Sequence, residues 1–159
     1  MSRKRKVGYS GGCQCGAVRY ALNARPEQAH LCHCRMCQKA VGNAFAALAP
    51  VRNKDFAWTK GAPAVFRSSS AAERGFCAAC GTPLFFRYVD SEWIDVTIGS
   101  LDDPEQVPPE LHYGAESRLS WMKSLGALPS ENTSDGGLTG APKDITSFQH
   151  PDHDDPEPN

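Results

Sequence analysis

Seven cysteines fall in three short clusters, and their spacing is the feature of this chain that could support chemistry. The clusters are Cys13-Gln14-Cys15, the run 32–37 with cysteines at 32, 34 and 37, and Cys77-Ala78-Ala79-Cys80. Thiolates at such short spacings bind soft or borderline cations, and zinc is the usual occupant. Four thiolates form a closed tetrahedral site, whereas three leave one coordination position open. Seven cysteines therefore suit one closed site and one open site.

The two outer clusters are the natural partners in the closed site. Each supplies two cysteines and is followed by a glycine, Gly16 or Gly81, which permits a tight backbone around the metal. Two ligands do not make a stable site, so the pairs are expected to share one ion. That structural ion would contribute folding free energy directly, because no preformed site exists in the unfolded chain. Its four ligands would be Cys13, Cys15, Cys77 and Cys80.

The middle cluster supplies three ligands, Cys32, Cys34 and Cys37, from six residues. Three thiolates on Zn²⁺ leave one formal negative charge and a free position, where an incoming thiol would lose its proton more easily. A histidine could instead fill that position and abolish catalysis; the candidates are His30, His33 and His112. The spacing favours two Zn²⁺ per chain, with an iron–sulfur cluster as a further option.

Composition agrees with cysteines that remain thiols. Nothing in the 159 residues reaches the roughly 18 consecutive apolar residues of a membrane span. The start of the chain, Met1 to Tyr9, lacks the apolar stretch of a secretory signal. An odd cysteine count would also leave one thiol unpaired in a disulfide framework. We therefore expect a cytoplasmic protein with no membrane partner.

Charge divides the chain into three parts. From Ser130 onward there are seven acids and one base, so the first 129 residues carry a net charge of +5. We expect a basic N-terminal tail over 1–7, a zinc-binding domain over 8–128, and an acidic Pro/Asp-rich tail over 129–159. The acidic tail is expected to be disordered, because it has few apolar residues to bury. The basic run Arg3 to Lys6 has no interleaved aromatic residues, so a nucleic-acid partner is not expected.

The domain itself reads as short strands joined by turns. Alternation of apolar residues predicts a strand over 17–22, and β-forming residues predict strands over 45–49, 84–88 and 94–98. We expect the second of these strands to end at Pro50, and residues 35–40 to form the single helical turn. The fold class is therefore mainly β, built of short antiparallel strands stapled by zinc.

Four segments resemble the glutathione-dependent formaldehyde-activating enzyme (GFA) family. They are residues 11–20, 32–39, 74–84 and 99–104, and all seven cysteines lie on the motif positions. His112-Tyr113 and Ser120-Trp121 fit the end of the family's domain, so the resemblance spans roughly residues 8–125. It implies that the zinc-binding domain over 8–128 is of the GFA type, and it is specific to the family and not to one activity within it.

The resemblance implies an Mss4-like, mainly-β fold with two zinc ions. It implies that Cys13, Cys15, Cys77 and Cys80 hold a structural zinc, and that Cys32, Cys34 and Cys37 hold a catalytic zinc. The activity implied is that of a carbon–sulfur lyase on S-(hydroxymethyl)glutathione, with glutathione and formaldehyde as small-molecule partners. Related folds serve as chaperone-like and centromere-associated proteins. A non-catalytic zinc-binding interaction module, or a lyase using a different thiol adduct, is therefore the alternative.

Binding of the glutathione carboxylates would require a basic side chain near the middle cluster. Arg35, Lys39 and Arg74 are the candidates by proximity in the sequence. Each also fits a solvated surface charge.

Overall fold

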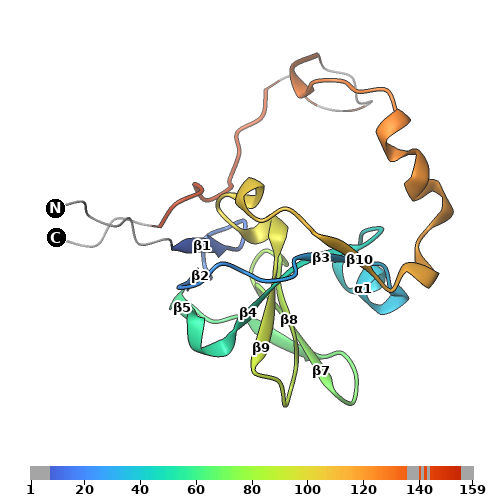
Figure 1. The fold of residues 1–159 in the computed structure, drawn as a ribbon. Coiled ribbons are helices and arrows are strands. Elements are labelled where there is room, and N and C mark those ends of the chain that lie inside the picture. Colours follow the sequence, from blue (N-terminus) through green and yellow to red (C-terminus); the bar gives the residue numbers. More distant parts are fainter. Residues whose placement is uncertain (1–7, 136–139, 141, 143, 155–159) are drawn as a thin grey trace, which may run out of the picture.

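Two β-sheets form the framework of the computed structural model, which describes residues 8–135, 140, 142 and 144–154 (Figure 1). The smaller sheet has the strand order β1-β2-β5, with β1 at Tyr9–Gly12, β2 at Arg19–Leu22 and β5 at Phe56–Lys60. The larger sheet has the order β10-β3-β4-β9-β8-β7-β6. Its strands are β3 His30–Cys32, β4 Ala46–Arg52, β6 Ala64–Arg67, β7 Ala72–Phe76, β8 Pro83–Tyr88, β9 Trp93–Thr97 and β10 Leu111–Tyr113.

The mainly-β prediction is confirmed, and the pairing in the described chain is antiparallel with one exception. β10 runs parallel to β3, with Tyr113 opposite Cys32. This pairing carries the end of the domain back to the middle cysteine cluster. Backbone hydrogen bonding continues past the strand, since the His33 N–H donates to the Tyr113 carbonyl at 2.8 Å.

The helix and the β8–β9 hairpin agree with the sequence prediction. The strand predicted over 17–22 begins only at Arg19, and the strand predicted over 45–49 ends later than expected. The helix α1 spans Arg35–Val41, and β8 and β9 coincide with their predicted ranges to within one residue. The prediction that the strand ends at Pro50 is wrong, because β4 continues to Arg52. β3 pairs with β4 only from Ala46 to Leu48, so Pro50 lies past the end of β3. Pro50 therefore has no β3 partner that would require its missing N–H, although it still lies opposite Asp95 of β9.

The main core lies between the smaller sheet and the centre of the larger one. Val18, Tyr20 and Leu22 are buried, as their alternation predicts, and the rings of Phe56 and Trp58 pack against Tyr20. A second, smaller core surrounds the middle cysteines and includes Ala46 and Leu48 of β4. The cysteine clusters therefore lie beside packed apolar side chains.

After β10 the chain leaves the sheets through 3₁₀ turns, the longest at Ser120–Ala127, and residues 144–154 return beside β1 (Figure 1). There the His150 N–H donates to the Gln14 carbonyl at 2.7 Å. The division at residue 128 and the disorder of the tail stay predictions, and the basic residues 1–7 lie outside the described residues. No described helix is long and apolar enough to cross a membrane.

Candidate metal centres and active-site cavity

The structure brings the cysteines together in the two groups that the spacing predicts. One group contains Cys13, Cys15, Cys77 and Cys80, and the other contains Cys32, Cys34 and Cys37. Within each group all sulfur atoms lie within 4.8 Å of one another, and all seven cysteines are free of disulfides.

The sulfur–sulfur distances match those around a tetrahedral zinc ion. Zn–S bonds of about 2.3 Å at tetrahedral angles place two sulfurs about 3.8 Å apart. The observed separations are 3.6 Å for Cys13–Cys15, 3.8 Å for Cys15–Cys77 and 3.5 Å for Cys32–Cys34. Both groups could therefore hold a metal ion of this size.

Two glycine turns shape the four-sulfur group. Gly16 and Gly81 have φ angles of +77° and +79°, in the left-handed region that glycine adopts without strain. Their N–H groups donate to the carbonyls of Cys13 and Cys77, which closes each turn around its sulfurs. The group joins the β1–β2 loop to the β7–β8 loop, so an ion here would tie the two sheets together.

The three-sulfur group sits where β3 passes into α1. Cys32 ends the strand, Cys34 is the N-cap of the helix, and Cys37 lies in its first turn. The Cys34 sulfur accepts a hydrogen bond from the Cys37 N–H at 3.4 Å, which caps the helix. Gly114 lets the segment after β10 pass closely, because a Cβ there would lie 3.1 Å from the Cys34 nitrogen. The role of Gly114 could not be predicted from the sequence, since nothing local marks a long-range approach.

No described histidine, aspartate or glutamate joins the three sulfurs as a fourth ligand within 4.8 Å. His33 is fully buried, and its Nε2 lies 2.8 Å from Nδ1 of His112, so these two rings contact each other. His30 Nδ1 lies 3.0 Å from the Gln28 carbonyl oxygen. Among the described side chains, the group therefore offers three ligands and leaves a fourth position for another molecule.

A cavity of about 350 Å³ opens over the three sulfurs. Arg74 lines it and donates from Nη2 to the Cys37 sulfur at 3.3 Å, while its guanidinium carbon lies 4.8 Å from the centre of the Phe86 ring. Arg35 and Lys39 line a separate hollow beside Trp121. Of the three basic candidates, the structure thus places only Arg74 at this cavity.

Arg74 also affects the ionisation of the sulfur beside it. A hydrogen bond from Cys32 and the nearby Arg74 guanidinium lower the pKa of the Cys37 thiol to about 5. The pKa of Cys32 is correspondingly raised, by its hydrogen bond to Cys37 and by burial. Without a metal, the Arg74 guanidinium therefore favours a thiolate at Cys37.

Asp95 of β9 lines the same cavity and was not found from the sequence. Burial raises the pKa of its carboxyl group to about 6. Its position in the middle of a strand gave no local signal, because only the pairing of β9 with β4 and β8 places it here.

Asp95→Asn is expected to stabilise the protein at neutral pH. Because the pKa is raised on folding, the native state binds more protons than the unfolded state between about pH 4 and 6, so stability falls as pH rises through that range. The amide removes this cost, about 3 kcal/mol at pH 7, and changes little at pH 4. Urea unfolding at both pH values measures the difference. Asp90→Asn, at an exposed position, is the control and should change neither value.

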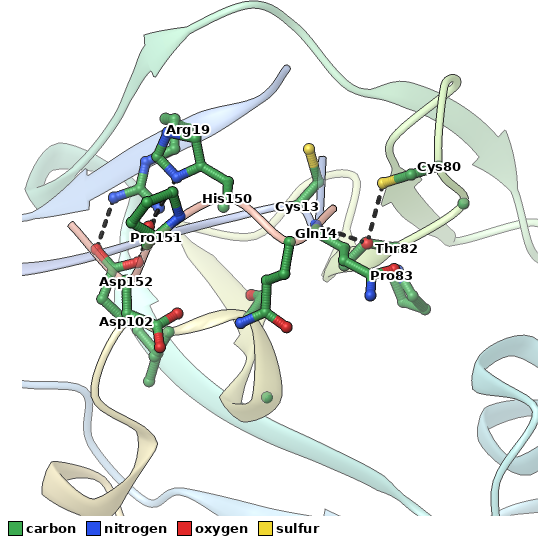
Figure 2. A pocket seen from close by; sticks show the side chains of 16 residues that line it. Cys13, Gln14, Arg19, Cys80, Thr82, Pro83, Asp102, His150, Pro151 and Asp152 are labelled. Carbon is green, nitrogen blue, oxygen red and sulfur yellow. Dashed lines mark hydrogen bonds and ion pairs between the residues drawn. The ribbon is translucent and has the colours of Figure 1, made fainter. Parts of the chain in front are cut away.

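A second hollow, of about 390 Å³, lies beside the four-sulfur group (Figure 2). Figure 2 shows His150 and Pro151 of the returning segment next to Arg19, with Gln14 and Cys80 further along the rim. Arg19 is buried and forms ion pairs with Asp102 at 2.6 Å and with Asp154 at 2.8 Å. Asp102, which lies shortly after β9, thus neutralises the buried guanidinium of Arg19.

Asp102→Asn is expected to lower the free energy of unfolding by about 3 kcal/mol, because loss of one partner leaves a buried charge poorly compensated. Asp154→Asn is the matched control. The Asp154 side chain is 56% exposed, so its ion pair should contribute less than about 1 kcal/mol. Urea denaturation of both variants measures the contrast, and equal losses would contradict the assignment of Asp102 as the principal partner.

Comparison with known proteins agrees with the sequence motifs. The family model described as glutathione-dependent formaldehyde-activating enzyme matches residues 8–117, more than half of the chain. The chain therefore belongs to this family, whose name and relatives point to lyase-type enzymes.

One relative and one solved structure are also similar to this chain. A Schizosaccharomyces pombe protein named as an uncharacterized lyase is 30% identical over 84 residues, which are 53% of this chain and 61% of the relative. This chain thus aligns with less than two thirds of that relative. A Rhodobacter sphaeroides protein of known crystal structure has a TM-score of 0.51 at 23% identity, over 65% of this chain and 98% of its own, and shows the shared fold.

Proposed function

We propose that this protein is a zinc-dependent carbon–sulfur lyase that makes and breaks adducts of a thiol with an aldehyde, of the S-(hydroxymethyl)glutathione type. The observation that carries the proposal is the three-sulfur group, which opens on a cavity and has no fourth ligand among the described side chains. Membership of the family supplies glutathione and formaldehyde as the first substrates to test.

We further propose two Zn²⁺ per chain. Cys32, Cys34 and Cys37 would hold the catalytic ion, and Cys13, Cys15, Cys77 and Cys80 the structural ion. A zinc ion bound by three thiolates supplies a free coordination position and a positive charge that lowers the pKa of a sulfur ligand. The seven free thiols also fit a reducing compartment such as the cytoplasm.

The chain's own residues can carry the proton and orient the site. In the proposed direction of synthesis, the Asp95 carboxylate accepts the proton of the substrate thiol. The thiolate sulfur then forms a bond to the carbonyl carbon, the C=O π electrons move to oxygen, and that oxygen takes the proton back from Asp95. A pKa of about 6 allows the carboxyl group to accept and to release a proton near neutral pH. Arg74, at 3.3 Å from Cys37, holds that sulfur in place.

Exchange NMR of glutathione and formaldehyde tests the proposal. The zinc-loaded protein is expected to increase the exchange rate between free glutathione and its hydroxymethyl adduct above the spontaneous rate measured without protein. The Cys34→Ser protein, loaded with zinc at its four-sulfur group, is the control for bulk effects of protein. A rate equal to the spontaneous one, for glutathione and for every other thiol tried, would contradict a lyase and favour a zinc-binding interaction module.

A further inference from the structure

The wall of the cavity over the three sulfurs is largely apolar. It is built from Met36 of α1, Phe86 and Tyr88 of β8, and Leu111 and Tyr113 of β10. All but Phe86 are substantially exposed, from 43% for Leu111 to 60% for Tyr113. Large apolar side chains that gather at one cavity while remaining in contact with water mark a ligand-binding surface.

The aromatic side chains that line the cavity form two edge-to-face contacts. The Phe86 and Tyr88 rings meet edge to face, with centroids 5.1 Å apart. Tyr113 packs in the same manner against His30, at 6.0 Å. Edge-to-face contacts hold each ring in place, so the walls present fixed apolar surfaces to a ligand.

The charges in the cavity do not match those of glutathione. Glutathione carries two carboxylates and one ammonium group, so a dedicated site needs more than one basic side chain. Among the described residues, Arg74 is the only lysine or arginine that lines the cavity. Its guanidinium already donates to Cys37 and, at 2.9 Å, to the Ser68 hydroxyl, and it stacks on Phe86. Asp95 adds a carboxyl group to the same cavity.

The size of the cavity also exceeds what formaldehyde requires. An apolar cavity of about 150 Å³ accommodates benzene. The present cavity, at about 350 Å³, has more than twice that volume, with Cys32, Cys34 and Cys37 among its lining residues. A one-carbon aldehyde would leave the apolar walls in contact with water, which costs free energy compared with a larger apolar group.

We propose that the adduct this protein processes carries an apolar substituent of about the size of an aromatic ring, which packs between Phe86, Tyr88 and Leu111. The substituent can belong to the aldehyde or to the thiol; the shared chemistry is an apolar group attached near the carbon–sulfur bond. This inference rests on the proposed lyase function and names its substrate class.

Three substrate pairs test the proposal by exchange NMR on the zinc-loaded protein, each corrected for its spontaneous rate. They are glutathione with formaldehyde, glutathione with phenylacetaldehyde, and phenylmethanethiol with formaldehyde. We expect kcat/KM to be at least about tenfold higher for one of the two aromatic pairs than for the first, and the faster pair identifies the source of the substituent. Acceleration of all three pairs to the same degree, or of the first pair most, overturns the substrate class but leaves the lyase. Acceleration of none overturns both.

A pair of matched variants separates the cavity wall from general effects. Leu111→Glu places a charge on the apolar wall, whereas Val65→Glu places one at a similarly exposed strand position that does not line the cavity. Calorimetric titration should show phenylmethanethiol binding at least about tenfold more weakly to Leu111→Glu than to Val65→Glu, with 2-mercaptoethanol binding alike to both. Equal affinity of phenylmethanethiol for the two folded variants would overturn the proposal. Circular dichroism confirms that both variants fold.

Discussion

The Cys77→Ser protein is expected to be already unfolded at 25 °C, so that heating it produces no cooperative transition. Cys77 is buried and supplies one of the four sulfurs that join the β1–β2 loop to the β7–β8 loop, 62 residues apart for Cys15 and Cys77. A structural zinc contributes on the order of 10 kcal/mol to folding in small domains. The whole stability of a domain is only about 5–15 kcal/mol. Loss of a ligand from this site should therefore remove most of the stability, as thermal unfolding followed by circular dichroism will show.

The same substitution in the other group is the control for Cys77→Ser. Cys34→Ser also replaces a thiol by a hydroxyl within a cysteine cluster, and Cys34 is half-buried. A Cys77→Ser protein with the wild-type melting temperature would contradict a structural role for the four-sulfur group.

Cys34→Ser is expected to abolish activity while the fold persists. Removal of an interaction in the outer shell of a metal site already costs about 10- to 100-fold. Loss of one of three ligands should therefore lower the exchange rate by at least about 100-fold, to the spontaneous rate. Stability should change by only about 1–2 kcal/mol, or a few degrees in melting temperature, because the second core around Leu48 and Ala46 remains packed.

Zinc analysis accompanies the activity measurement of Cys34→Ser. The variant should retain one zinc ion per chain, since its four-sulfur group is intact. If it unfolds to the same extent as Cys77→Ser, the functional distinction between the two groups is wrong. If it retains wild-type activity, the three-sulfur group is not the catalytic site.

The cysteine grouping could be predicted from the sequence because it depends on local chemistry. Pairs separated by one or two residues and followed by Gly16 or Gly81 define a knuckle wherever they occur. A pair of cysteines supplies only two of the four ligands of a closed zinc site, so the two pairs are expected to share one ion. The three remaining cysteines then form the second group. The end of β4 could not be predicted in the same way. A proline ends a strand only where a neighbouring strand needs its N–H, and the neighbours of Pro50 in the sheet are not visible in the sequence around it.

The cavity could not be predicted, because its walls come from strands that are far apart in the sequence. Leu111 reaches the site only through the parallel pairing of β10 with β3, and Asp95 only through β9. Arg19 illustrates the same point in the core. Its place between two buried apolar residues predicts exposure, but Asp102, 83 residues away, provides a charged partner that allows it to be buried.

Zinc release measured together with folding tests the central claim most directly, namely that one site is closed by four sulfurs and the other is left open by three. The zinc-loaded protein is titrated with a chelator while zinc in solution and circular dichroism are recorded in the same sample. We predict two zinc ions per chain, the first released at low chelator concentration with the fold retained and the second only as the protein unfolds. Release of both ions together with unfolding, or a single ion per chain under zinc-replete conditions, would contradict the account.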